Sequence, residues 1–269
     1  MPYILKTLTT SETRDAVHDK RLSICLAADG FSYTEVSAQG ELLAYGEATG
    51  SHSGIMTEAT RDIKQFFAEM DIRPIGFRRM ELIVCSDENV WVPDEVYTAA
   101  SNRAYLRLVG GSGQTATAVP CRDIASTAVF AVDDTIVTAF KVALPGLTVA
   151  NQHIRLVSCA RLSGSHPLLI ANWRNQRVDI AAFREGRYLY GNTLTFSDEN
   201  ALAYQLVEVM RTFDMETPST ELLMCGDVDR ERFARFRPYF PKVTLFTGCC
   251  TMGPAFRTFH SYRHALLLI

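Results

Sequence analysis

Two cysteines and two histidines near the end of the chain are of the types that bind zinc. Cys249 and Cys250 are adjacent, and three residues separate His260 from His264, a spacing that places two imidazoles on one face of a helix. Adjacent cysteines do not form the usual Cys-x₂-Cys arm of a zinc site. We therefore favour buried free thiols and two surface histidines, and we predict no metal site.

Arginines alternate with aromatic residues between positions 230 and 237, a pattern that would suit an anion or nucleic-acid patch on a helix. They are Arg230, Arg232, Arg235 and Arg237, interleaved with Phe233 and Phe236. Acids at positions 227, 229 and 231 dilute this charge, and the whole chain has a formal net charge of −3. We predict a solvated helix face with inward phenylalanines, and no nucleic-acid partner.

Two other segments contain residues found in phosphate-binding or catalytic motifs, but not in the order that those motifs require. Residues 110–113 (Gly-Gly-Ser-Gly) have no lysine of the kind that meets phosphates in a P-loop. Residues 163–166 place serine beside histidine in sequence, without a nucleophile elbow. Both segments are interpreted as loops, and no catalytic residue is assigned.

The amino-acid composition limits the classes of protein to which this chain can belong. The chain has 269 residues, of which 47% are hydrophobic and 21% charged, values typical of a globular protein. No stretch approaches the roughly 18 apolar residues of a transmembrane segment, and residues 1–21 have no apolar signal-peptide segment. The seven cysteines are an odd number for a disulfide framework. We expect a cytoplasmic protein with reduced thiols.

The elements that would position any site occur as two similar series. Alternating apolar residues and glycine turns predict a three-strand meander in each series, and apolar residues three and four apart predict the helix that follows. The first series has strands at 22–26, 31–36 and 41–46, a helix between Ile55 and Met70, and a strand at 80–85. The sequence Pro93-Asp94-Glu95 then predicts a helix opening.

The second series repeats this order. Its predicted elements are strands at 167–172, 177–183 and 187–191, a helix from 197 to 213, and a strand at 221–227. Between the series we predict a strand at 126–132 and helices at 135–143 and 153–161. We favour an ancient duplication over chance. The predicted organisation is an N-terminal extension (1–20), a first subdomain (21–162) and a second subdomain (163–269).

This doubled order of elements resembles the actin-like ATPase superfamily, which includes actin, sugar kinases, and pilus-assembly and cell-division adaptors. More narrowly, three segments look like a bacterial family of unknown function that carries this fold: Arg21-Leu22-Ser23-Ile24, Ala28-Asp29-Gly30-Phe31-Ser32, and Asn89-Val90-Trp91-Val92-Pro93 ahead of Tyr97. The resemblance implies an α/β, ribonuclease H-like duplicated fold with two βββαβα-type subdomains. It also implies a nucleotide cleft between them, lined by a phosphate loop from each meander.

Phosphate chemistry needs acids in those loops, because carboxylates and water hold Mg²⁺ and orient the attacking water. The first loop keeps Asp29, Gly30 and Ser32, although Asp-Gly is also a favoured hairpin turn. The second loop reads Asn172-Trp173-Arg174-Asn175, which is bulky and has no acid. After the last predicted strand of the second series, members of the superfamily usually have two consecutive glycines that approach the adenosine. This chain has only one glycine there, Gly226. These departures argue against ATP hydrolysis.

Arg174 would suit a phosphate or an acidic ligand, but a single turn arginine is more often a solvated surface residue. We assign it no role. The predicted site is a vestigial nucleotide cleft in which Asp29, Gly30, Ser32 and Gly226 contact the cofactor, without a catalytic residue or a metal. We predict no cofactor, and vestigial binding of ATP with Mg²⁺ is the alternative left open.

Two functions stay open at this point. The first is a non-catalytic scaffold or adaptor that acts through an unknown protein partner, with a homo-oligomer as a further possibility. The second is a Mg²⁺-dependent ATPase or small-molecule kinase, in which Asp179 or Asp227 replaces the missing acid of the second loop.

Overall fold

The structure is a computed structural model that describes residues 3–10, 14, 17–27, 30–50, 61–111, 115–164, 166–174 and 176–269. Several expected features fall outside these residues. They are Asp29 of the first loop, the beginning of the helix expected between Ile55 and Met70, Ser112 and Gly113 of the glycine-rich segment, Ser165, and Asn175 of the second loop.

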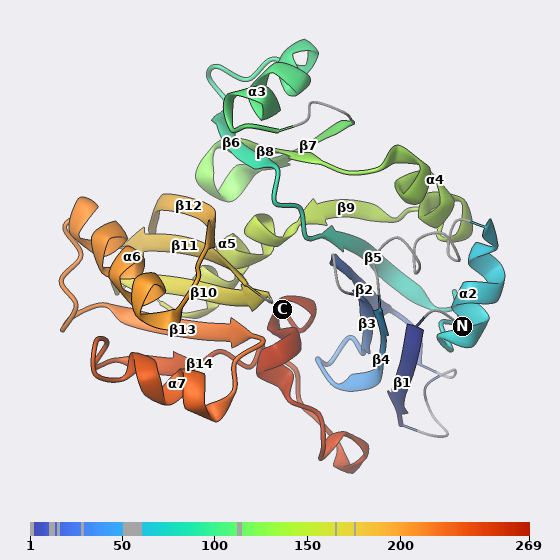
Figure 1. Cartoon of the computed structure of the whole chain (residues 1–269). Coiled ribbons are helices and arrows are strands. Elements are labelled where there is room, and N and C mark those ends of the chain that lie inside the picture. Colours follow the sequence, from blue (N-terminus) through green and yellow to red (C-terminus); the bar gives the residue numbers. More distant parts are fainter. Residues whose placement is uncertain are drawn as a thin grey trace.

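The first sheet contains six strands in the order β1-β4-β3-β2-β5-β9 (Figure 1). Their bounds are β1 Tyr3–Thr9, β2 Lys20–Ala27, β3 Gly30–Val36, β4 Leu42–Gly50, β5 Phe77–Val84 and β9 Thr148–Asn151. The strands β2, β3 and β4 form the predicted antiparallel meander, and β5 and β9 continue the sheet in parallel. Residues 3–9, expected within an N-terminal extension, pair with β4 at the edge of the sheet.

The second sheet contains five strands in the order β12-β11-β10-β13-β14. Their bounds are β10 Leu168–Arg174, β11 Arg177–Arg184, β12 Arg187–Thr195, β13 Glu221–Gly226 and β14 Val243–Leu245. The first three form an antiparallel meander, and β13 and β14 run parallel to β10. Apart from β1, the two sheets share one strand order: third, second, first, fourth, fifth. The predicted duplicated topology is confirmed.

Helices cover the outer faces of the two sheets, and α5 packs between them (Figure 1). The outer helices are α2 Ile63–Glu69 and α4 Asp134–Ala143 on the first sheet, and α6 Glu199–Thr212 and α7 Arg230–Phe236 on the second. The inner helix α5 spans Gln152–Leu162. Asp133 and Asp198 cap α4 and α6 by accepting backbone hydrogen bonds.

A small third sheet lies beside the first sheet, with strands in the order β6-β8-β7. Its strands are β6 Asn89–Pro93, β7 Ala116–Cys121 and β8 Ser126–Ala131, and α3 Asn102–Leu108 packs on them. The predicted helix opening at Pro93 is wrong. Pro93 ends β6, because the residues before it pair with β8, and the α-helix begins only at Asn102.

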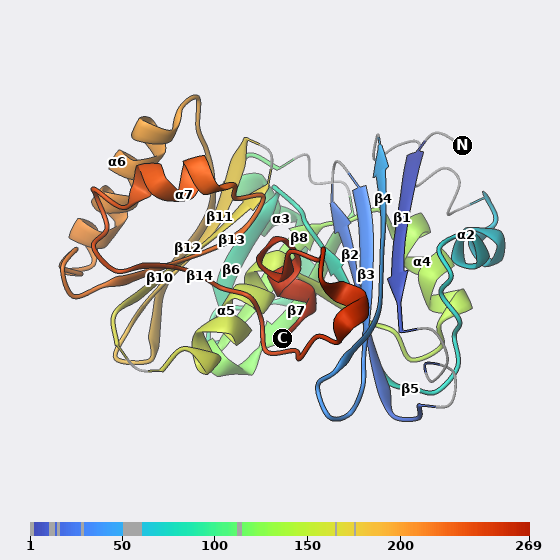
Figure 2. The same cartoon turned by 90° about the horizontal axis from the view of Figure 1, so that it is seen from below.

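A C-terminal segment, residues 254–268, lies between the first and second sheets (Figure 2). It contains two 3₁₀ helices, Pro254–Phe256 and Ser261–Leu267. Its apolar side chains enter the cores of both sheets: Phe256, Phe259 and Leu268 pack with β3 and β4, and Leu266 packs with β10 and β13. Among the helices that the structure describes, none combines the length and the apolar character that crossing a membrane requires.

Candidate functional site

A cavity of about 360 Å³ opens between the two sheets, where the resemblance implies a cleft. Gly30 and Ser32 of β3 line one wall, and Gly226 at the end of β13 lines the opposite wall. The C-terminal segment closes a further side with Phe259 and Arg263 among its lining residues. Three of the four predicted site residues therefore lie together, and the fourth, Asp29, is outside the described residues. Their contact with a nucleotide stays a prediction.

Both glycines also have a structural reason to be glycine. Gly226 has a φ of +83°, and a Cβ atom there would clash with the carbonyl oxygen of Trp173. At Gly30, a Cβ atom would lie 2.8 Å from the carbonyl oxygen of Ala48 on the neighbouring strand. Close backbone approach accounts for these positions without a ligand.

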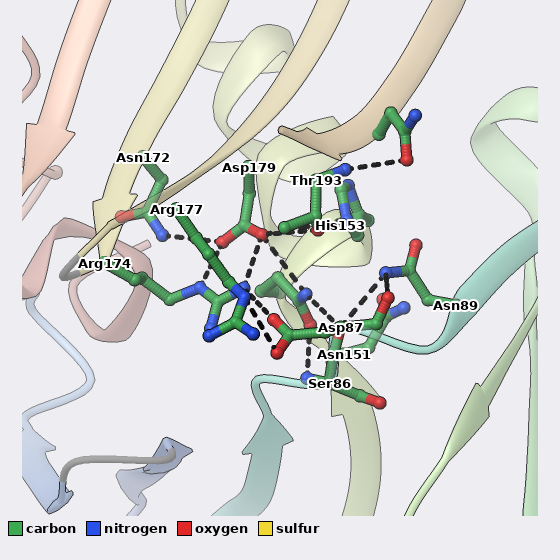
Figure 3. A network of polar contacts seen from close by, with 12 residues as sticks. Ser86, Asp87, Asn89, Asn151, His153, Asn172, Arg174, Arg177, Asp179 and Thr193 are labelled. Atoms are coloured by element: carbon green, nitrogen blue, oxygen red, sulfur yellow. Dashed lines mark hydrogen bonds and ion pairs between the residues drawn. The ribbon is translucent and has the colours of Figure 1, made fainter. Parts of the chain in front are cut away.

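Arg174 is not the solvated surface residue that its sequence context suggests. Its side chain is only 12% exposed. Its Nε lies 2.6 Å from Asp179 Oδ2, and its Nη2 lies 2.7 Å from Asp179 Oδ1 (Figure 3). The same Nη2 lies 3.1 Å from Asp87 Oδ1. Because Asp179 belongs to β11 and Asp87 follows β5, one guanidinium bridges the two sheets.

Asp179 is fully buried and accepts hydrogen bonds from three further side chains. These donors are Gln152 at 3.3 Å, Asn172 at 3.1 Å and Thr193 at 2.8 Å. Burial opposes ionisation, but the hydrogen bonds and charge of Arg174 outweigh it and hold the pKa of the Asp179 carboxyl below its usual value. Asp179 does not line the cavity. This carboxylate is therefore charged and committed to protein donors.

Gln152, which directly follows β9 of the first sheet, makes a second connection between the sheets through its hydrogen bond to Asp179 of β11, and it also binds the end of β5. Its Oε1 accepts a hydrogen bond from Ser86 N at 3.1 Å, and its Nε2 donates to Ser86 O at 2.7 Å. Arg177 of β11 adds an ion pair with Asp87 at 3.0 Å. Residues 86 and 87 follow β5, so the end of this strand is held to α5 and to the β10–β11 hairpin (Figure 3).

The first hairpins of the two sheets end in different residue pairs. The last pair of β2 and β3 is Ala27 with Gly30, whereas the last pair of β10 and β11 is Arg174 with Arg177. The second hairpin therefore ends in two cations, and both of them contact Asp87.

The acid Asp227, proposed as the alternative replacement, does reach the cavity. Its side chain is 61% exposed and lies 3.6 Å from Arg263 of the C-terminal segment. Among the two candidate replacement acids, only Asp227 is therefore available to a ligand in the cavity.

The cysteine and histidine residues near the end of the chain have separate environments. His264 is mostly buried, lies 2.9 Å from Tyr45 Oη and stacks on Phe259, and its burial lowers its pKa to about 3. His260 contacts the ring of Tyr262 instead. The expectation of two surface histidines is wrong for His264, and the expected burial is wrong for Cys249, which is exposed. Within the described parts of the chain, no group of three or more His, Cys, Asp or Glu residues could hold a metal ion.

The arginine-rich segment forms α7, and its predicted orientation is confirmed. Phe236 is buried, and Phe233 packs against the core of the second sheet. Arg232 and Arg235 lie 2.9 Å and 3.3 Å from the carboxylate of Glu199. These two arginines are thus paired with an acid of the same surface, whereas Arg237 lies over the ring of Phe233.

Comparison with known proteins places the chain in a family. The DUF3822 family, described as proteins of unknown function, matches residues 10–243. The chain belongs to the DUF3822 family. This confirms the expected membership of a family of unknown function. A search of curated protein sequences finds no match to the DUF3822 chain.

Solved structures confirm the fold of this DUF3822 chain. A Bacteroides thetaiotaomicron protein with an actin-like ATPase fold and unknown function is similar with a TM-score of 0.69 and 17% identity, covering 86% of this chain and 91% of that one. A chain of the PilM–PilN type IV pilus biogenesis complex is similar with a TM-score of 0.59 and 13% identity, covering 92% and 96%. The actin-like ATPase fold is therefore confirmed.

Sequence reasoning missed the connection made by Arg174, Asp179 and Gln152. One signal was present: Asp179 is a single acid within the otherwise apolar run 178–183. A buried acid needs a partner, and the antiparallel hairpin brings Arg174 beside it. Gln152 gave no comparable signal, because its partner Ser86 is distant in the sequence.

Proposed function

We propose that this DUF3822 protein acts through a protein partner and does not hydrolyse ATP. The observation that supports the proposal is the ion pair of Arg174 with Asp179 beside the cavity. Mg²⁺ bound to phosphates requires carboxylate or water ligands. A guanidinium at the end of β10 repels a divalent cation, and the carboxylate of Asp179 beside it is already paired with that guanidinium.

Direct contacts between the sheets support a scaffold role. In ATPases with a cleft of this kind, a bound nucleotide would lie between the halves, as the resemblance implies. Here Arg174 joins Asp179 to Asp87, and Gln152 joins Asp179 to Ser86, so protein groups connect the same two regions. A surface that spans both sheets is thus held in one arrangement without a ligand, which favours binding of a protein partner at low ordering cost.

The similarity to a chain of the PilM–PilN complex also supports a protein partner. That complex contains a protein of this fold bound to another protein. We extend this mode of action to the DUF3822 chain as part of the proposal. Assembly with further copies of the chain stays a prediction, which a concentration-dependent mass would test.

Phosphate release from Mg²⁺-ATP by the purified full chain tests the proposal. We expect no release above that of the heat-denatured protein. A partner cross-linked in cells should be recovered in equal yield from extracts with and without Mg²⁺-ATP. Turnover of ATP that Asp29→Ala abolishes would overturn the proposal.

Nucleotide binding in the cavity is the second candidate function. It is favoured by the position of Gly30, Ser32 and Gly226 on facing walls and by the exposed carboxylate of Asp227. Thermal unfolding with ATP or ADP, with and without Mg²⁺, separates the candidates, because a ligand at about 100 times its Kd adds roughly 2.7 kcal/mol of stability. A Mg²⁺-dependent rise in the melting temperature that is lost in Asp227→Asn would favour this second function.

A further inference from the structure

Cys25 and Cys85 lie side by side in the wall of the cavity. Their Sγ atoms are 3.5 Å apart, and both residues line the cavity. Cys25 belongs to β2 and lies opposite Ile83 of β5, and Cys85 directly follows β5. Because residues two apart on a strand share a face, Cys25, Ile83 and Cys85 point to the same side of the sheet.

The two sulfur atoms approach each other along the diagonal between neighbouring strands. Cys85 lies two residues beyond the partner of Cys25, and such diagonal neighbours have Cα atoms about 7–8 Å apart, whereas disulfides usually join Cα atoms about 4.4–6.8 Å apart. Cys85 is held close to β2, since its backbone N donates to Leu26 O at 2.8 Å. Closing the remaining gap of about 1.5 Å between the sulfur atoms therefore requires a small backbone shift of Cys85 at the end of β5, together with side-chain rotation.

The equivalent cysteine of the second sheet has a different neighbour. Cys225 stands where Cys85 stands in the first sheet, but its Sγ lies 3.6 Å from Asn172 Oδ1. Cys121 and Cys159 are buried, and Cys249 is exposed. Opposed thiols that share a cavity wall are therefore a feature of the first sheet.

Both thiols are partly exposed and line the cavity, so a peroxide that enters the cavity can reach either sulfur. A hydrogen bond with Cys25 and burial raise the pKa of the Cys85 thiol, so that Cys85 holds its proton. Since the thiolate is the form that attacks a peroxide, Cys25 is the sulfur that reacts first.

We propose that Cys25 and Cys85 form a reversible disulfide, a redox modification site in the cavity wall, with hydrogen peroxide as the oxidant. The sulfur of Cys25 attacks one peroxide oxygen, which breaks the O–O bond and leaves a sulfenic acid and one water. The sulfur of Cys85 then displaces the sulfenic hydroxyl, and its proton leaves with that group as a second water. Two thiols are oxidised, one peroxide is reduced, and a dithiol reductant reverses the bond.

The bond would join β2 to the residues that hold the two sheets together. β2 leads toward the first loop, whereas Ser86 and Asp87 contact Gln152 and Arg174. Oxidation would therefore couple the wall of the cavity to the contacts between the sheets. This site is independent of the proposed function, since it requires neither a protein partner nor a nucleotide.

Peptide mapping of the full wild-type chain tests the site. The protein is treated with hydrogen peroxide, its remaining thiols are alkylated, and it is cleaved with trypsin without reduction. Trypsin places Cys25 in peptide 22–61 and Cys85 in peptide 80–103, and each peptide contains a single cysteine. We expect these two peptides as one linked species that dithiothreitol separates.

Matched variants give the controls. Cys25→Ser and Cys85→Ser should each abolish the linked species, whereas Cys225→Ser, at the equivalent place of the second sheet, should leave it. Oxidation of the exposed Cys249, found in peptide 243–257, shows that the oxidant was active. The site is ruled out when wild-type protein has oxidised Cys249 but unlinked 22–61 and 80–103 peptides, or when Cys25 is found only as a sulfinic acid.

Discussion

Arg174 donates one hydrogen bond to each carboxylate oxygen of Asp179, so that the two residues form a bidentate pair inside the β10–β11 hairpin. This geometry fixes the plane of the guanidinium group. The fixed plane leaves Nη2 within 3.1 Å of Asp87 on the other side of the cleft. A pairing within one sheet therefore sets the contact between the two sheets.

Replacing Arg174 with alanine should lower the free energy of unfolding by about 3–5 kcal/mol, because Asp179 would be left as a buried charge without its cation. Urea unfolding measures the loss. Arg177→Ala is the matched control, since it removes the other arginine bound to Asp87. The Arg177 side chain is 42% exposed, so its loss should cost less than about 1 kcal/mol.

Similar losses in the two alanine variants would contradict this view of the buried pair. A double variant, Arg174→Met with Asp179→Asn, should recover much of the stability that Arg174→Ala loses, because it leaves no buried charge.

Gln152→Glu should destabilise the contact between the sheets by about 2–4 kcal/mol. The variant keeps the shape of the side chain but loses the donor that faces Ser86 O and Asp179 Oδ1, and it adds a negative charge there. The control is Gln65→Glu in α2, where an exposed Gln65 donates to Glu69 at 3.0 Å. That change should cost only about 0.5 kcal/mol. Equal effects in denaturant unfolding would show that the buried Gln152 contacts contribute little.

Acid should destabilise the protein partly through His264. Burial lowers the pKa of His264 to about 3, whereas an unfolded histidine has a pKa of about 6.5. Between these values the unfolded chain binds the proton and the folded chain does not. Stability should therefore fall as the pH drops from about 6.5 toward 3, by at most about 1.4 kcal/mol per pH unit from this group.

Denaturant unfolding at several pH values, compared with His264→Gln, measures this contribution. Glutamine can keep a hydrogen bond to Tyr45 but does not titrate. We expect a smaller loss of stability with acid in the variant. Some loss should persist, because burial also lowers the pKa of His153. Coincident pH profiles of the two proteins below pH 6.5 would exclude His264 as a source.

Gly226→Ala should be far more damaging than Gly186→Ala. Both glycines have positive φ values, +83° and +72°, so each alanine pays about 1–2 kcal/mol for a left-handed backbone. At Gly186 a Cβ atom meets nothing within 4 Å, but at Gly226 it clashes with Trp173 O. Thermal unfolding should show a modest loss at 186 and a loss above about 3 kcal/mol at 226. Matching melting temperatures would mean that the backbone near Gly226 relaxes freely.

Much of the fold follows from local signals in the sequence. The meander strands alternate apolar and polar residues, their turns contain glycine, and the aspartates Asp133 and Asp198 cap helices. These signals act over a few residues, so they can be read without knowing what packs nearby. The strand β1 lacks such a signal, because its pairing with β4 joins segments about forty residues apart.

The candidate site was only partly predictable for the same reason. Gly30, Ser32 and Gly226 lie at the ends of predicted strands, and the topology brings those ends to one cavity. The role of Arg174 depends on Asp87, which is 87 residues away and belongs to the other sheet. Pro93 shows the opposite error, since a local helix signal lost to the long-range pairing of β6 with β8.

The segment 254–268 contributes side chains to the cores of both sheets. Thr34 of β3 also donates to Leu267 O at 3.1 Å, and the opposite side of the segment packs on β13. While this segment is displaced, the inner face of each sheet loses apolar packing partners. The two sheets should therefore form one cooperative folding unit, which melts in a single calorimetric transition rather than in two steps.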